Sequence, residues 1–488
     1  MNRRELLRSL GFGVSAGLVM PGLFSSCKSE DPAPKTDYSG TIAVVGAGAS
    51  GLYIADILKA KGIKVVLLEA SDRVGGRVRT LKANDKPSAS LLFNSQSELG
   101  SDFPNELGAT FIKGSDSAWS KFVQELKINT VNLTSTTVDN YVVDGSVMSA
   151  AALASDADFI AAKNFLDNLA SQSGASAVED AIAAAGINER MYSILNAWIG
   201  NNYSSSNDRM GMQAVAEAYA MRTRDHDLFT LVNNPMEDAL LSRFSKVVED
   251  VRVNSVVKQI DYTGSTVVIT GDNTKTGEPF SLEVEKVVVT VPISILKNNS
   301  IAFTPGLPAS KSAALNTMAM DASFRVILDF KSNFWGATSG FLYGAGEAPE
   351  YFNGGVGRSD LGKTLSVTIS GPKATGYSLM GKNSLPLLIN ELDSLFNGKA
   401  STGIRMDGND NMVAIIQDWT LDPYIRGGGS YSKPGGTNQH RVDLAAPVND
   451  KVFFAGEATD ITGDFGTING ALLSAERAAK EVGQAIGV

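Results

Sequence analysis

Cysteine and histidine are almost absent from this sequence. Its 488 residues contain one cysteine, Cys27, and two histidines, His226 and His440. A disulfide needs two cysteines, and a structural zinc site usually takes four cysteine or histidine ligands. The composition therefore excludes a disulfide-bonded scaffold, a cysteine/histidine metal site and a cysteine nucleophile, and no bound metal is expected.

An excess of basic charge is also missing. Lysine and arginine total 43 against 52 aspartates and glutamates, which gives a formal net charge of −9. Proteins that bind nucleic acid cluster lysine and arginine against phosphates, so no nucleic-acid partner is expected. With 43% hydrophobic and 19% charged residues the chain has an ordinary globular composition, and its length allows two or three domains.

The N-terminus lacks an apolar run long enough to span a membrane. Residues 9–26 are uncharged, but they are glycine-rich and shorter than the roughly 20 apolar residues of a stable span. Arg3, Arg4 and Arg8 precede them, so residues 1–26 resemble a twin-arginine export signal, which carries proteins already folded around a cofactor. We expect export to the periplasm or cell surface.

The end of this signal resembles a lipoprotein cleavage box. Residues 24–27 read Phe-Ser-Ser-Cys, which makes Cys27 the lipidated first residue of the mature chain. The alternative is a plain cleaved signal with an incidental cysteine. Residues 27–40 are polar and contain proline, as suits a tether. Any contact with a membrane would then be made only through a lipid anchor at Cys27.

The chain after residue 40 begins with a predicted strand–helix–strand unit. Residues 41–46 form a short apolar run, residues 52–60 repeat apolar side chains with a helical period, and residues 63–69 form a second apolar run. Glycines 46, 48 and 51 lie at the turn between strand and helix, in the spacing of a dinucleotide-binding loop. Gly46, Gly48, Ala49, Ser50 and Gly51 are therefore predicted to approach a pyrophosphate at the helix N-terminus.

Glu69 ends the second strand, where a carboxylate accepts hydrogen bonds from ribose hydroxyls. The alternative is a glycine-rich turn selected only for close packing, but that does not explain Glu69. The spacing leaves NAD and FAD equally open.

Residues 68–77 resemble the signature of the flavin amine oxidase superfamily, which favours FAD. They read Leu-Glu-Ala-Ser-Asp-Arg-Val-Gly-Gly-Arg. The resemblance implies that Gly75, Gly76 and Arg77 continue the phosphate site, with Arg77 as the fixed cation of the diphosphate.

Four further segments resemble the same family in the same order, at residues 106–111, 253–257, 419–431 and 454–470. The cofactor contacts that this resemblance implies are Gly108, Ala109, Thr110, Val257, Trp419, Gly456, Glu457, Thr467 and Ile468. Taken alone, Trp419 also suits an ordinary core, Glu457 a surface carboxylate or a helix cap, and Arg77 a solvated surface charge.

The sequence departs from the family at a lysine that usually stands ten residues before a tryptophan and holds a water against flavin N5. Counting back from Trp335 gives Arg325. Arginine keeps the charge but does not deprotonate, and it presents a planar fork. Lys331 is no replacement, because six residues of strand separate it from Arg325 by about 20 Å. We hypothesise that Arg325 faces the flavin and lowers its reactivity with oxygen.

Four further positions differ from named relatives in the family. Gly429 and Thr467 stand where monoamine oxidases have two tyrosines, and Gly428 stands where they have the cysteine that bonds to flavin. The aromatic cage is therefore expected to be missing and FAD to be non-covalent. Lys113 stands where polyamine oxidases place histidine or glutamate, which argues against polyamines unless it is a solvated surface residue.

The expected fold is α+β, with a Rossmann-like FAD domain, an inserted antiparallel meander and a mixed α/β substrate domain. Residues 253–291 alternate as a three-stranded meander, and residues 472–482 have one apolar helix face. The FAD domain is predicted at residues 41–115, 245–300 and 445–488. The substrate domain is predicted at residues 116–244, with helices near 159–169 and 212–221, and at residues 301–444.

The resemblance implies hydride transfer to flavin N5 from a carbon alpha to an amine nitrogen. The substrate would be a small amine or amino acid, the product a carbonyl compound, and the electron acceptor O2, giving hydrogen peroxide, or another acceptor. Arg325 and Trp419 are the predicted catalytic residues. Two alternatives stay open: a flavin dehydrogenase or desaturase of a non-amine substrate, and a non-catalytic FAD-binding surface lipoprotein.

Overall fold

A four-stranded parallel sheet forms the centre of one half of the molecule. The computed structural model describes residues 36–222, 224–358 and 363–488. The sheet has the order β2-β1-β12-β21, with β2 Lys64–Leu68, β1 Thr41–Val45, β12 Lys286–Val289 and β21 Val452–Phe454. Ile42, Ala43 and Val44 of β1 have no exposed surface. Their unbroken apolar run reflects burial on both faces of a parallel sheet.

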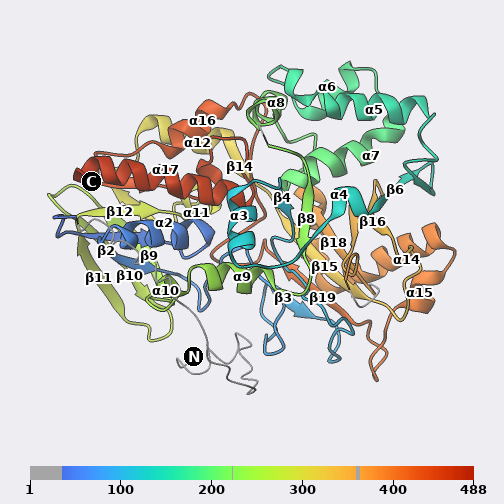
Figure 1. Ribbon diagram of the computed structural model, residues 1–488, viewed down its shortest axis with the longest axis horizontal. Helices are drawn as coiled ribbons and strands as arrows, with labels where there is room; N and C mark the ends of the chain where they lie inside the picture. The colour runs from blue at the N-terminus through green and yellow to red at the C-terminus, as the bar shows by residue number, and fades with distance from the viewer. Residues whose placement is uncertain (1–35, 223, 359–362) are drawn as a thin grey trace, which may run out of the picture.

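Helices α2 (Ala49–Ala60) and α17 (Ile468–Ile486) lie side by side on this sheet (Figure 1). The apolar face predicted for the last helix is confirmed, because Leu472, Ala475 and Val482 are fully buried in the core that α2 shares. The two ends of the described chain are therefore packed into one core.

A second sheet is the predicted antiparallel meander. Its order is β11-β10-β9-β13, with β9 Ser255–Asp261, β10 Val267–Asn273, β11 Pro279–Val284 and β13 Ala302–Thr304. The first three strands are antiparallel, as predicted, and β13 adds to β9 in parallel.

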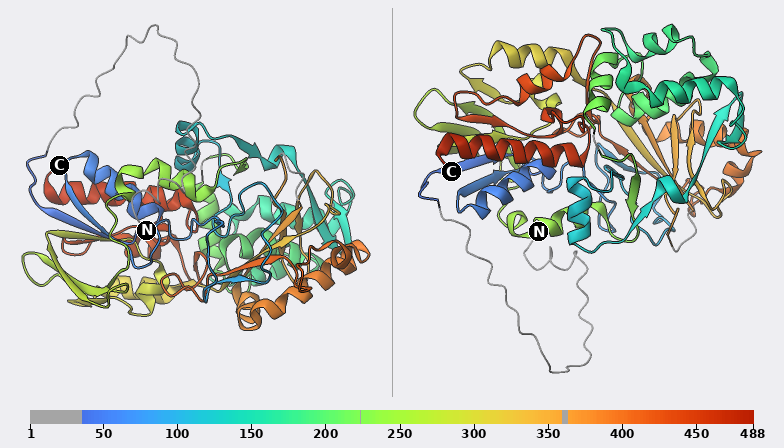
Figure 2. Two further views of the ribbon diagram at one scale, coloured as in Figure 1. Left: turned by 90° about the horizontal axis from the view of Figure 1, so that it is seen from below. Right: turned by 45° about the horizontal axis from the view of Figure 1, so that its top comes forward.

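The other half of the molecule is built on an eight-stranded sheet (Figures 1 and 2). Its order is β3 (Leu91–Phe93), β19 (Ala414–Asp418), β15 (Ser323–Asp329), β18 (Thr364–Ser370), β17 (Glu350–Asn353), β16 (Ser339–Tyr343), β6 (Val138–Val143) and β7 (Ser146–Ser149). All of β15 is buried, and it lies in the interior of the sheet between β19 and β18.

Helices pack against this sheet in two separate core clusters. One contains α5 (Ala157–Asp167), α6 (Val178–Ala184), α7 (Tyr192–Leu195) and α8 (Met212–Met221), and the other contains α13 (Gly371–Met380) and α14 (Leu385–Phe396). Helices α5 and α8 confirm the two helices predicted near residues 159–169 and 212–221. The α+β fold class is confirmed.

Several elements lie across the predicted domain boundaries. Helices α3 (Ala118–Glu125) and α9 (Met236–Arg243) were assigned to the substrate domain, but Trp119 and Leu240 pack in the core of α2. Strand β3, assigned to the FAD domain, is the edge strand of the eight-stranded sheet. Hydrophobic periodicity predicts an element but does not reveal which core it joins.

The smaller elements complete the frame. Strands β4 (Ile112–Lys113), β8 (Leu228–Leu231) and β5 (Thr130–Asn132) form one sheet, and β14 (Met318–Met320) pairs with β20 (Ser430–Ser432). Helices α11 (Ile293–Lys297), α12 (Ala309–Thr317) and α16 (Asn438–Ala445) pack beside the meander.

The predicted export signal at residues 1–26, Cys27 and most of the 27–40 linker lie outside the described residues. Within the described ranges, no helix is both long enough and apolar enough to cross a membrane.

Leu472→Ala should destabilise the protein by about 2–5 kcal/mol, because this side chain is fully buried between α17 and α2 and its removal leaves a cavity. Chemical denaturation of the flavin-loaded protein measures the change. Leu379→Ala is the matched control, since Leu379 is 86% exposed and should change stability by less than about 0.5 kcal/mol. Equal effects of the two substitutions would contradict the packing described.

Candidate functional site

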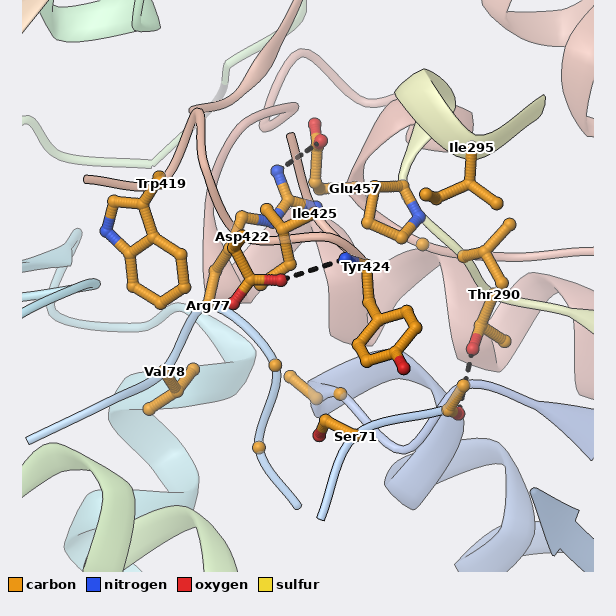
Figure 3. A pocket seen from close by; sticks show the side chains of 18 of the residues that line it. Ser71, Arg77, Val78, Thr290, Ile295, Trp419, Asp422, Tyr424, Ile425 and Glu457 are labelled. Atoms are coloured by element: carbon orange, nitrogen blue, oxygen red, sulfur yellow. Dashed lines mark hydrogen bonds and ion pairs between the residues drawn. The ribbon is translucent and has the colours of Figure 1, made fainter. Parts of the chain in front are cut away.

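A cavity opens at the carboxyl ends of β1, β2 and β12 (Figure 3). Val45 and Leu68, the last residues of β1 and β2, line it, as does Thr290 directly after β12. This edge of a doubly wound parallel sheet is where dinucleotides bind.

The glycine turn lies at the inner end of this cavity. Gly46, Gly48, Ala49 and Ser50 line it, and Gly46 has a φ of +104° that favours glycine. Helix α2 begins after Gly48 without a side-chain cap, so its first backbone N–H groups remain available for an anion.

Gly51 was predicted to bind the cofactor, but it does not line the cavity. A Cβ atom at Gly51 would lie 1.8 Å from the carbonyl oxygen of Gly46. Gly51 therefore permits close packing of α2 against the turn rather than cofactor contact.

Glu69 lines the cavity from the end of β2. Its Oε2 accepts a hydrogen bond from the backbone N–H of Ala47 at 2.8 Å, and its Oε1 accepts one from Ser71 at 2.9 Å. These bonds fix the carboxylate and leave lone pairs for ribose hydroxyls, since each carboxylate oxygen accepts more than one bond.

Arg77 and Glu457 join two distant parts of the chain beside the cavity (Figure 3). Arg77 Nη1 donates to Glu457 Oε1 at 2.8 Å and to the Gly428 carbonyl at 2.7 Å. Glu457 Oε2 accepts from Ser430 Oγ at 2.7 Å and from the Gly466 N–H at 2.8 Å. Burial acts to raise the pKa of Glu457, but the charge of Arg77 and these bonds hold it below the ordinary value.

Trp419 lines the cavity with 4% of its surface exposed. Its Nε1–H donates to the carbonyl of Leu107 at 2.9 Å. A Cβ atom at Gly108 would lie 1.9 Å from the Arg77 carbonyl oxygen and 3.2 Å from Trp419 Cζ2. Only glycine fits there, so Trp419 and the turn at Arg77 hold Gly108 and Ala109 against the cavity.

Arg325 reaches the same cavity from β15 of the other half of the molecule. Its Nη1 donates to Thr110 Oγ1 at 2.8 Å, Ser366 Oγ at 3.0 Å and the Glu106 carbonyl at 3.3 Å. Burial lowers the pKa of the guanidinium, whereas the carboxylates of Glu350 and Glu106 oppose that shift.

Thr110 was predicted to contact the cofactor directly, but it lies outside the cavity lining. Its hydroxyl accepts the bond from Arg325 and donates to the Gly108 carbonyl at 3.0 Å. Thr110 therefore positions the Arg325 guanidinium rather than contacting the cofactor. The remaining predicted site residues that line the cavity are Gly75, Gly76, Val257, Gly456, Thr467 and Ile468.

Sequence reasoning missed several lining residues. Thr290 donates to the Gly46 carbonyl at 3.0 Å, and Pro292 and Ile295 follow it along the wall. The apolar run that ends at Pro292 was a usable signal, because parallel strands end at the same edge of a sheet. Arg73 and Tyr424 also line the cavity, and both lie inside segments recognised by resemblance.

Ser204 had no such signal. It lines the cavity in a left-handed conformation with a φ of 61°. A Cβ atom at Gly428 would lie 2.7 Å from Ser204 Cβ, and one at Gly429 would lie 3.2 Å from Ser204 Oγ. The absence of side chains at Gly428 and Gly429 therefore leaves room for Ser204. Gly429 is one of the two positions at which the sequence predicted no aromatic side chain.

The geometry defines a dinucleotide site of the Rossmann type. Arg325 and Thr368 of the eight-stranded sheet line the same cavity, at what we call its outer end. The family model described as "Flavin containing amine oxidoreductase" matches residues 49–483, so the chain belongs to this family. Membership confirms FAD over NAD, and the glycine-faced turn, the uncapped helix and Arg77 fit such a cofactor.

Relatives with curated names support the same family. "Lysine-specific histone demethylase 2" of Homo sapiens is 25% identical over 98% of this chain and 58% of its own length. "Polyamine oxidase 4" of Oryza sativa subsp. japonica is 22% identical over 96% of this chain and 91% of its own. The chain therefore spans just over half the length of the demethylase.

Solved structures share the fold. Cyclohexylamine oxidase from Brevibacterium oxydans IH-35A has a TM-score of 0.73 at 20% identity, covering 92% of this chain and all of that one. Wild-type putrescine oxidase bound to putrescine has a TM-score of 0.74 at 18% identity, covering 91% of this chain and 98% of that one. Among the described residues, no cluster of three or more metal-ligating side chains is found.

Glu457→Gln should lower the stability of the protein by about 3 kcal/mol and release much of its flavin, because it leaves Arg77 without its buried counter-charge. Thermal unfolding and the flavin-to-protein absorbance ratio measure both effects. Asp272→Asn is the control, since its ion pair with Lys258 is exposed and worth less than about 1 kcal/mol. Full flavin retention by Glu457→Gln would show that the pair does not organise the site.

Proposed function

We propose that this protein is an FAD-dependent amine oxidase. It oxidises a C–H bond alpha to the nitrogen of a small amine, and the resulting imine is hydrolysed to a carbonyl compound. The observation that carries the proposal is that Arg325 and Trp419 line the same cavity as the glycine turn and Arg77. Bound FAD supplies the hydride acceptor, and the protein supplies orientation and electrostatics.

The cofactor would be held by groups that surround the inner cavity. The N-terminus of α2 and Arg77 suit the diphosphate, and Glu69 suits a ribose. Trp419 fixes the Leu107–Gly108 segment that would underlie the ring. Gly428 leaves no thiol at the family's attachment position, which supports non-covalent binding.

The amine class is supported by the proteins that resemble this chain. They are named for polyamines, putrescine, cyclohexylamine and lysine residues of histones, which share an amine nitrogen. This favours an amine over the non-amine substrate that the sequence left open. Buried side chains such as Arg325 and Trp419 enclose the outer end of the cavity. This enclosure supports a catalytic role over a protein that only retains FAD as a structural group.

Arg325 bears on the electron acceptor. Its three acceptors fix a guanidinium where the family has an ammonium, and a guanidinium does not release a proton at neutral pH. We therefore propose that O2 reoxidises the flavin slowly and that a second acceptor competes with it.

Arg325→Lys should accelerate reoxidation of the chemically reduced protein by O2 about tenfold, which corresponds to about 1.4 kcal/mol of activation free energy. Stopped-flow absorbance after mixing with oxygenated buffer measures the rate without any substrate. Arg190→Lys is the control, because Arg190 pairs with Asp144, Asp156 and Asp158 away from the cavity. An unchanged rate in Arg325→Lys would refute the assignment.

We also propose that the mature protein is exported and anchored through a lipid on Cys27, on the basis of residues 1–27. Mass spectrometry of the mature N-terminus should find a lipidated Cys27. An unmodified cysteine, or cleavage at another residue, would refute the anchor.

A further inference from the structure

One row of side chains crosses the eight-stranded sheet at the outer end of the cavity. Thr368 of β18 is directly opposite Arg325 of β15 on one side and Glu350 of β17 on the other. Directly opposed residues project from the same face of a sheet, with Cβ atoms about 5 Å apart. Arg325 and Thr368 line the cavity, so Glu350 is the next side chain along that face.

The Arg325 guanidinium has one saturated edge and one open edge. All three of its hydrogen bonds leave from Nη1. Within the described ranges, no residue accepts a hydrogen bond from Nε or Nη2, yet neither atom is sealed in the interior. These two N–H groups form the planar fork that binds a carboxylate through two parallel hydrogen bonds.

The side chain of Glu350, like the open edge of Arg325, has no hydrogen-bond partner among the described residues. Its carboxylate makes neither a hydrogen bond nor an ion pair with any described residue, and its oxygens also retain accessible surface. Arg325 and Lys113 are nevertheless near enough for their charges to act on its pKa. A cationic fork and an anion therefore share one face without neutralising each other directly.

The part of the cavity lining around Gly428 and Gly429 is small and polar. Ser204 occupies the space above Gly428 and Gly429, and Ser323 and Thr467 also line the cavity. Hydroxyls and glycines at these positions suit a polar molecule better than the flat aromatic ring that a cage would bind.

We propose that the substrate is a zwitterionic amino acid whose carboxylate is bound by the open edge of Arg325 and whose amino group faces Glu350. The inference rests on the proposed amine oxidation and names its substrate class. An amino group must be neutral before its C–N bond is oxidised, and the Glu350 carboxylate is placed to accept the proton that the ammonium loses.

The charges around Glu350 set an expected pH dependence. Burial raises the pKa of Glu350 to about 7. The positive charges of Arg325 and Lys113 oppose this rise, and the negative charge of Asp139 adds to it. Tyr343 also lies beside Glu350. Burial lowers the pKa of Lys113 to about 7, and its Nζ donates to Asn202 Oδ1 at 2.7 Å. Glu350 is anionic above this pH, so the KM for an amino acid should rise as the pH falls below it.

The test compares matched compounds on the flavin-loaded protein. Leucine, 3-methylbutylamine and 4-methylpentanoate share the 2-methylpropyl side chain, and the last two lack the carboxylate and the amino group respectively. Alanine and phenylalanine provide parallel sets. Under anaerobic conditions, one of the amino acids should reduce the flavin at least 100-fold more efficiently than its decarboxylated amine. The matching carboxylate should perturb the flavin spectrum without reducing it.

Variants assign the two contacts. Arg325→Lys should weaken binding of the simple carboxylate at least tenfold, because it loses the bidentate fork but keeps the charge. Glu350→Gln should leave carboxylate binding unchanged, raise the KM for the amino acid about tenfold and remove its rise below pH 7. Lys113→Met should retain carboxylate binding but move the rise in KM to higher pH, because it removes a positive charge that opposes the raised pKa of Glu350. Flavin spectra confirm that each variant is folded.

The outcomes separate this inference from the proposed function. Reduction by no amine and no amino acid would contradict the proposed function, and carboxylate titration of Arg325→Lys would still test the anion site. Equal efficiency of amine and amino acid would overturn the zwitterion inference alone. Loss of carboxylate binding in Lys113→Met, but not in Arg325→Lys, would overturn the assignment to Arg325.

Discussion

The ion pair between the partly exposed Arg77 and the buried Glu457 is the contact on which the site depends. It joins residues 380 positions apart, and through Gly428 and Ser430 it also ties in the segment that follows Trp419. Removal of either partner would leave the other charge uncompensated, so the pair stabilises the packing of the segment after β2 against the turn after β21. That constraint places the glycine turn, the Trp419 segment and the end of β21 around one cavity.

The second half of the molecule contributes its chemistry through β15. Because this strand is paired on both sides and wholly buried, it holds Arg325 in a rigid position, and the Thr110 and Ser366 hydroxyls fix one edge of the guanidinium. The other edge is left to the cavity. If both proposals for Arg325 hold, the replacement of a family lysine by arginine links two properties: reactivity toward oxygen and recognition of a substrate anion.

The local elements that form the inner site could be predicted from sequence, because their signals are local. The apolar run of β1, the glycine spacing and Glu69 predict the turn, and helical periodicity predicts α17. The meeting of Arg77 with Glu457 came only from family resemblance, since no local pattern encodes a contact across most of the chain. Ser204 was missed because its left-handed backbone follows an irregular helical turn without a sequence signature. Gly51 and Thr110 were assigned to the cofactor because motif membership does not distinguish lining residues from the packing behind them.

The most direct test is the flavin content of the purified protein before and after denaturation. The account predicts a yellow protein with one FAD per chain, which denaturation releases completely into the supernatant. A colourless protein that does not take up FAD on reconstitution would contradict the account, as would flavin that stays bound to the denatured chain.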